Sequence, residues 1–137
     1  MHARRQIRES IAAMVTGLAS TGTRVHQSRM RPQGAAGLPC LLVTTNDEDV
    51  TPGTIGNIYE RSLTVIVRGF AMGSTTLDDD LDQIALEVET AMSAYTNAVL
   101  DKLEIDFDDE LEKPVGSIAM TYKVSYYTAA NSPGTLI

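Results

Sequence analysis

The chain has 137 residues, of which 43% are hydrophobic, and a formal net charge of −7. This length suits one domain, and this hydrophobic fraction argues against wholesale disorder. The acidic balance argues against nucleic-acid binding, which depends on Lys and Arg to neutralise phosphates. Cys40 is the only cysteine, and no apolar run approaches the roughly 18 residues of a membrane span. We therefore expect a soluble protein made in a reducing cytoplasm.

In the first third of the chain, the pattern of apolar residues predicts one helix and two strands. Apolar residues at intervals of three or four predict an amphipathic helix over residues 3–19, which ends at Thr21-Gly22 because glycine commonly follows the last turn. A short strand over residues 23–28, a loop over 29–38 and a compact apolar strand over 39–45 should follow. The apolar stripe of the helix is Ile7, Ile11, Met14 and Leu18.

Residues 46–57 contain several acids, three glycine or proline residues and no clear periodicity, so we expect a long loop. Long loops without secondary structure are uncommon in compact domains and tend to be functional or mobile. The next segment, residues 58–70, is the best candidate for a central strand. Its alternation directs Leu63, Val65 and Val67 to one face.

The second half of the chain predicts a second helix and a hairpin. Strands are expected over residues 103–109 and 115–128, followed by a loose end. The chain is therefore predicted to form an α+β fold, with two helices packed on one face of a mixed, mostly antiparallel sheet. We assign residues 1–128 to a single domain and residues 129–137 to a flexible tail. The stripe of the second helix is Leu77, Leu81, Ile84, Val88, Met92 and Tyr95.

Charge is sorted along the chain. Residues 1–31 hold six arginines against one acid, Glu9, whereas the remainder holds five cations against seventeen acids. A basic and an acidic surface on one chain allow copies to associate head to tail, in rings or filaments. The alternative is that both are solvated faces of an ordinary monomer. The arginines are Arg4, Arg5, Arg8, Arg24, Arg29 and Arg31.

No pattern in the sequence indicates catalysis, a metal site or a cofactor site. Asp106, Asp108 and Glu110 alternate as the first ligands of an EF-hand do, but Leu111 stands where that loop needs glycine and Ser117 where it needs glutamate. The cluster of Asp78, Asp79, Asp80 and Asp82 suits a solvated helix start better than an ion at a subunit junction. Cys40 follows Pro39 in an apolar strand, so we expect a buried thiol, and no motif selects a serine for His26.

Five segments of the chain resemble tail terminator proteins of long-tailed bacteriophages, the family of the minor tail protein U. The resemblance covers nearly the whole chain in order, and it rests on patterned strands and helix starts. The segments are HARRQIRE (residues 2–9), LPCLLV (38–43), ERSLTV (60–65), LDDDLDQIA (77–85) and KPVGSIAMTYKVSY (113–126).

The resemblance implies a structural protein of the virion, assembled in the host cytoplasm, that forms a homohexameric ring. Such a ring caps the tail tube, stops its polymerisation and offers a surface to the head-side connector; DNA passes through without being specifically bound. A head–tail connector (neck) protein is the nearest alternative, and a metal-dependent enzyme using Asp106, Asp108 and Asp109 is the alternative from another class. The expected contact residues are Arg4, Arg8, Arg29, Arg31, Asp47, Glu48, Asp49, Thr51, Asp78 and Asp79.

Overall fold

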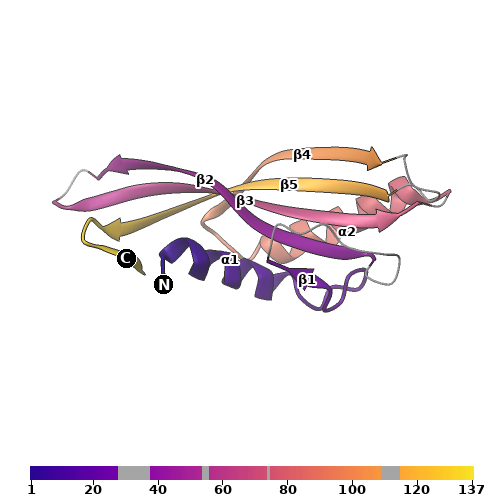
Figure 1. The fold of residues 1–137 in the computed structure, drawn as a ribbon, viewed down its shortest axis with the longest axis horizontal. Helices are drawn as coiled ribbons and strands as arrows, with labels where there is room; N and C mark the ends of the chain where they lie inside the picture. The colour runs from indigo at the N-terminus through magenta and orange to yellow at the C-terminus, as the bar shows by residue number, and fades with distance from the viewer. Residues whose placement is uncertain (28–37, 54–55, 74, 109–114) are drawn as a thin grey trace.

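The computed structural model describes residues 1–27, 38–53, 56–73, 75–108 and 115–137, and within them the chain forms two helices and a six-stranded sheet (Figure 1). The strand order is β1-β2-β3-β5-β4, and β6 pairs with β5 outside this path. β1 and β2 are parallel, whereas the other neighbours are antiparallel. The elements are α1 (Ala3–Met14), β1 (Val25–His26), β2 (Cys40–Pro52), β3 (Ile58–Met72), α2 (Leu77–Met92), β4 (Ala98–Asp108), β5 (Val115–Ala129) and β6 (Ser132–Leu136). The predicted α+β class is confirmed.

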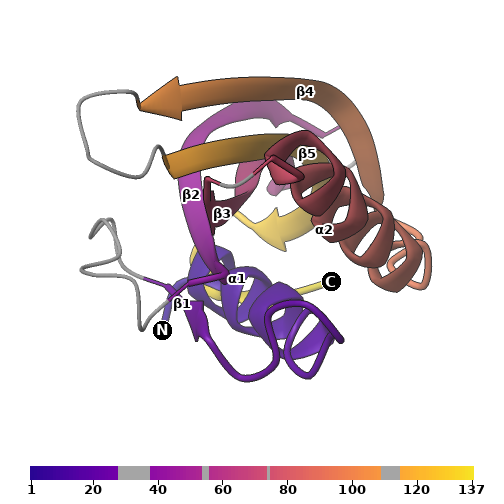
Figure 2. The same cartoon turned by 90° about the vertical axis from the view of Figure 1, so that its right-hand side faces the viewer.

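Both helices pack on one face of the sheet, as predicted (Figure 2). α1 lies against β2, and α2 lies against β3 and β5. The predicted alternation of the central strands is also confirmed, because Leu63, Val65 and Val67 of β3 are fully buried beneath the helices. On β5, alternate residues from Ile118 to Tyr126 join the same core. Burial of this one apolar face is what holds the two layers together.

α2 approaches the sheet most closely at two glycines. A Cβ atom at Gly69 of β3 would lie 2.6 Å from Cγ2 of Ile84, and one at Gly116 of β5 would lie 3.0 Å from Cδ1 of Leu81. A side chain at Gly69 would clash and one at Gly116 would be tightly packed, so these glycines allow the helix to sit directly on the strands. Neither of these two helices has the length and apolarity that crossing a bilayer requires, and no other helix occurs among the described residues.

The first helix is shorter than predicted and ends at Met14 rather than near residue 19. Gly17 adopts a φ of 90°, a conformation that favours glycine, and its N–H donates to the carbonyl of Gly22 at 2.8 Å. The chain therefore leaves the helix about five residues early. Leu18, which was expected on the buried helical stripe, is only partly buried beside the core.

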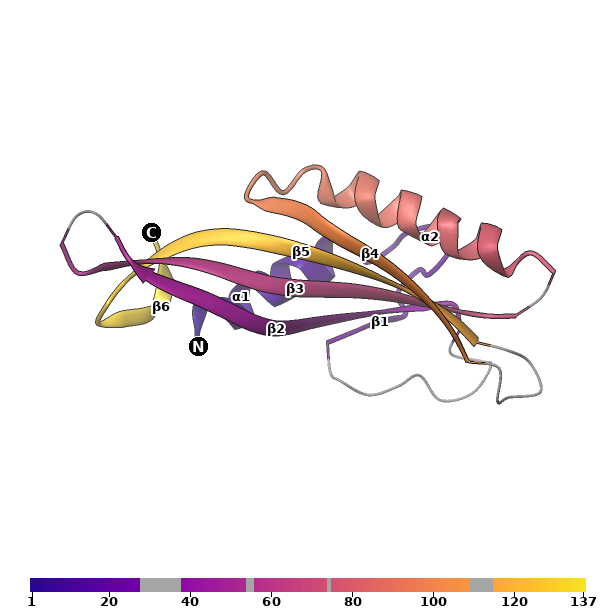
Figure 3. The ribbon, with the colours of Figure 1, turned by 90° about the horizontal axis from the view of Figure 1, so that it is seen from above.

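Residues 46–57 were predicted to form a long loop, and that prediction is wrong for residues 46–52, while residues 54 and 55 lie outside the described residues. β2 continues to Pro52 and pairs with β3 along its whole length, with a bulge between Thr45 and Glu48. The bulge shifts the register, which breaks the simple alternation that sequence reasoning relies on. Figure 3 shows the paired ends of β2 and β3 reaching beyond both helices. We call residues 46–52 and 58–61 the hairpin arm.

The chain end also differs from the predicted loose tail, because Ser132–Leu136 forms β6. β6 pairs with the end of β5, and Gln6 Nε2 of α1 donates to the carbonyl of Gly134 at 2.6 Å. A five-residue strand held mainly by backbone pairing carries no apolar alternation, so the pattern missed it. β4 likewise begins at Ala98, five residues earlier than predicted. The predicted loop over 29–38, except Leu38, and the turn over 110–114 lie outside the described residues.

Candidate interaction surfaces

The predicted basic contact residues on α1 have two different environments. Arg4 and Arg5 are exposed, and Arg5 forms an ion pair with Glu9 at 2.9 Å. Arg8 is partly buried, and its Nη1 donates to Oγ1 of Thr45 on β2 at 3.4 Å. Arg8 therefore helps to seat the helix on the sheet, whereas Arg4 and Arg5 face outward. The other two predicted contact residues of this group, Arg29 and Arg31, lie outside the described residues.

The acidic face of α2 also divides into two parts. Asp78 and Asp79 are exposed in the first turn, where carboxylates interact favourably with the helix dipole. Glu87, in contrast, accepts hydrogen bonds from the N–H of Ser20 at 2.8 Å and from its hydroxyl at 2.5 Å. Burial raises the pKa of Glu87, but the bonds from Ser20 and Gln83 outweigh it, and the pKa is lowered overall. Glu87 thus ties α2 to the turn after α1.

The predicted contact residues of the hairpin arm do not act as one group. Asp47, Asp49 and Thr51 are exposed, and a hydrogen bond with Thr64 lowers the pKa of the Asp47 carboxyl. Glu48 points to the helix side of the sheet instead, and its side chain is only 5% exposed. The bulge before Glu48 accounts for the difference, because it turns this one acid away from its neighbours.

Glu48 belongs to a buried polar network at the base of the arm. Its Oε2 accepts from Nη1 of Arg61 on β3 at 3.1 Å, and its Oε1 accepts from the hydroxyl of Tyr126 on β5. Nε of Arg61 donates to Oγ1 of Thr128 at 2.9 Å, while its guanidinium lies 5.6 Å from the ring centre of Tyr59. The network joins β2, β3 and β5 on the helix-facing side of the sheet.

Arg61 and Glu48 form a buried ion pair at the centre of this network. The side chains of Arg61 and Glu48 are 9% and 5% exposed, so removing one partner would leave an uncompensated charge. Burial, followed by the hydrogen bond and negative charge of Glu48, raises the pKa of the Tyr126 hydroxyl. Burial, Arg4 and Arg61 together lower the pKa of His2, the N-cap of α1, although Glu48 opposes them. The charges of the network therefore act on the start of α1.

Sequence reasoning missed this network, although one signal for it was present. Arg61 falls in phase with Leu63 and Val65, the inward positions of β3. A charged residue at an inward position requires a buried partner of opposite charge. The partner could not be chosen from the sequence, because Glu48 was assigned to a loop.

β4 presents a row of apolar side chains along an open edge of the sheet. Leu103, Ile105 and Phe107 are 45%, 51% and 44% exposed. They lie opposite residues of β5 that face the helices, but α2 packs chiefly against β3 and β5. A strand was predicted over residues 103–109, but none of these three residues was among the expected contact residues.

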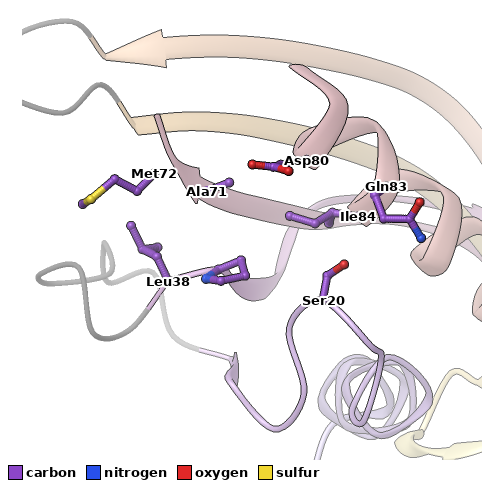
Figure 4. Close-up of a pocket in the computed structure, with 8 residues that line it drawn as sticks. Ser20, Leu38, Ala71, Met72, Asp80, Gln83 and Ile84 are labelled. Atoms are coloured by element: carbon purple, nitrogen blue, oxygen red, sulfur yellow. The ribbon is translucent and has the colours of Figure 1, made fainter. Parts of the chain in front are cut away.

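A pocket of about 350 Å³ opens between the start of α2 and the turn after α1. Figure 4 shows Asp80 and Gln83 of α2 on one side of it and Ser20 on the other. The wall is completed by Ile84 of α2, by the end of β3 and by the residues before β2. The lining residues are Ser20, Leu38, Pro39, Ala71, Met72, Asp80, Gln83 and Ile84.

Of the residues considered for chemistry, Asp80 lines this pocket, whereas Cys40 and His26 are not part of the lining. Burial raises the pKa of the Cys40 thiol, although Arg24 opposes the shift, and His26 is exposed on β1. Among the described residues, no three His, Cys, Asp or Glu side chains come together as metal ligands would. Asp106 is exposed, whereas the side chain of Asp108 and the whole of Asp109 and Glu110 lie outside that description.

Comparison with models of known protein families finds no match, and comparison with curated proteins finds none.

Proposed function

We propose that this chain is a structural subunit of a bacteriophage tail, a terminator that forms a ring on the end of the tail tube. The ring stops polymerisation of the tube and offers its other surface to the head-side connector. The resemblance of five segments to tail terminators suggests this role. The observation that carries it is the hairpin arm, which extends past both helices and exposes Asp47, Asp49 and Thr51.

Two further features support a subunit role. The exposed arginines of α1, and the exposed acids of β4 and of the first turn of α2, give one molecule two surfaces of opposite charge. Unlike surfaces are what copies need in order to associate head to tail and close a ring. The large apolar residues of β4 remain about half exposed in the single chain, and such rows mark contact sites.

The proposal is tested by removing the gene from the virus that encodes it. Tails of uncontrolled length are expected, because nothing would stop growth of the tube, and supplying the chain in trans should restore a single tail length. Electron microscopy measures both the length and the joining of tails to heads. Tails of normal length that fail to join heads would favour the alternative, a head–tail connector protein. Normal tails on normal heads would contradict both functions.

A further inference from the structure

β4 is an unusual edge for a protein that acts alone. It is 11 residues long, it pairs with β5 alone among the residues that the structure describes, and residues 101–107 are all exposed. Long edge strands with an exposed apolar row are templates for pairing with another chain. Proteins that stay monomeric shorten, cover, twist, bulge or charge such edges. β4 has charged residues and a bulge between Leu100 and Lys102, but its apolar row lies past the bulge and stays exposed. The row of Leu103, Ile105 and Phe107 therefore points to a partner.

The charge of β4 indicates which partner it suits. Asp101, Glu104 and Asp106 outnumber Lys102 among the exposed residues of this strand. Pairing of β4 with β4 of another copy would double the negative charge along one seam, which is unfavourable. A basic partner surface avoids this repulsion and adds attraction across the contact.

The same chain carries a basic surface on its opposite side. Figures 1 and 2 show α1 and β1 on the side of the molecule away from β4. Its positive charge comes from Arg4 and Arg5, which are exposed at the start of α1, and the exposed His26 of β1 lies toward the other end of this side. β1 is also the other end of the strand order, so the sheet has an acidic edge and a basic side.

Strand direction is compatible with contact between these two edges. β1 is parallel to β2, and each following step of the order, from β2 to β3, β5 and β4, reverses direction. β4 therefore runs opposite to β1 within one chain. When a second copy is placed edge to edge in the same orientation, its β4 runs antiparallel to β1 of the first copy, which is the commoner strand pairing in sheets.

We infer that β4 of one subunit docks against the α1–β1 side of a second copy of this chain. The contact joins two different surfaces, so it repeats from subunit to subunit and closes into a ring when the rotation between neighbours allows. Leu103, Ile105 and Phe107 supply the apolar area, while the acids of β4 and the arginines of α1 set the orientation. This inference rests on the proposed ring, and it names the two surfaces that form it.

The test uses three variants of the full chain and measures association by sedimentation up to about 1 mM protein. Ile105→Glu places a charge in the apolar row, and Arg4→Glu/Arg5→Glu reverses the basic surface. Leu86→Glu, at an α2 residue that is 59% exposed, is the matched control. Thermal melts check that each variant folds. If Ile105→Glu fails to fold, Glu104→Lys replaces it, because it reverses a charge at an exposed position.

The wild type and the Leu86→Glu control should associate with increasing concentration. Each of the other variants alone should show an apparent dissociation constant raised about tenfold or more. A mixture of Ile105→Glu with Arg4→Glu/Arg5→Glu should form a one-to-one dimer and no larger assembly. The first variant keeps an intact α1–β1 side and the second keeps an intact β4, so the two can make one contact and no further contact is possible.

Three results would overturn the inference: a wild type that stays monomeric over the whole range, an Ile105→Glu variant that associates as well as the wild type, or a mixture that forms no dimer. Wild-type association in Arg4→Glu/Arg5→Glu together with none in Ile105→Glu would also overturn it, because that result would show that β4 pairs with itself. The gene-removal experiment decides the proposed function separately. Normal tails without the gene would refute the terminator role and leave this contact between copies standing. Abnormal tails without the gene, together with variants that associate as well as the wild type, would support the terminator role and refute the contact.

Discussion

The part of the sheet that the helices cover differs sharply from the parts that they leave open. Under the helices, Leu41, Val67 and Met120 have no measurable exposure, whereas Val50 in the arm and Ile105 on β4 are 45% and 51% exposed. Since burial of apolar surface supplies most of the driving force for folding, the covered part accounts for the stability of the single chain. The open parts contribute little to it, and their side chains are available for contacts with other molecules.

The boundary between these regions is marked by a change in chemistry on one face of the same strands. β3 passes from Val65 and Leu63 to Arg61, and β2 passes from Val43 across its bulge to Glu48. Past the end of the apolar core, the ion pair between Arg61 and Glu48 joins the two strands. Substitutions in the covered part should therefore reduce stability, and those in the open parts should reduce assembly.

The largest effect is expected at the centre of the covered part. Leu81→Asp should unfold the domain, because Leu81 is 1% exposed and an unpaired buried charge costs several kcal/mol against a total stability of about 5–15 kcal/mol. Circular dichroism during heating measures the loss. Leu86→Asp on the same helix should melt close to the wild type, since Leu86 is 59% exposed. A cooperative wild-type melt in Leu81→Asp would contradict the assigned core.

The second effect concerns the boundary. Arg61→Met should destabilise the fold by about 3–5 kcal/mol, because Glu48 would remain buried without its partner. Chemical denaturation gives the free energy of unfolding. The double variant Arg61→Met/Glu48→Gln removes both charges and should recover much of the loss. If Arg61→Met unfolds at the wild-type denaturant concentration, the ion pair does not hold the base of the arm.

A smaller effect is expected where α2 touches β3. Gly69→Ala should cost about 1–3 kcal/mol, because its new methyl group would lie 2.6 Å from Cγ2 of Ile84. Combining it with Ile84→Leu, which removes that branch methyl, should restore part of the stability. Equal denaturation midpoints for Gly69→Ala and the wild type would show that the helix sits farther from the strand.

The smallest effect on stability concerns Glu87, whose pKa is lowered in the folded chain by Ser20 and Gln83 despite burial. A carboxyl group with a lowered pKa contributes its full stabilisation at pH values above its pKa in the unfolded chain. That contribution is lost as the pH falls through its pKa in the folded chain. Ser20→Ala should therefore cost about 1 kcal/mol or less at neutral pH, and the difference from the wild type should shrink in acid. Melts between neutral pH and the onset of acid unfolding measure it. A difference that grows in acid would contradict the assignment.

The covered part could be predicted from the sequence because it obeys simple periodicities. Apolar stripes located both helices, and the alternation of Leu63, Val65 and Val67 identified the buried face of the central strand. The end of α1 could not be placed, because Gly17 looked like any glycine in a helical pattern until its positive φ was seen.

The open parts escaped prediction because their structure depends on pairing rather than on burial. The second half of β2 is polar and carries a bulge, and β6 is held by backbone hydrogen bonds with β5. Neither leaves an apolar pattern. For the same reason, Glu48 was grouped with Asp47 and Asp49 as a contact residue, although it lies inside the polar network. Contact with other subunits or with a tube remains a prediction for the exposed residues.

The most direct test of the division between folding and assembly is a charge reversal on the hairpin arm, Asp49→Lys, in the virus and in the purified chain. Asp49 is exposed and lies opposite Ser62, away from the buried network. The purified variant should keep its stability within about 0.5 kcal/mol, as surface substitutions usually do. Virus carrying it should make tails of abnormal length or heads without tails in electron micrographs, whereas the matched reversal Asp82→Lys on α2 should not. A stable Asp49→Lys chain together with normal, joined tails would contradict the account.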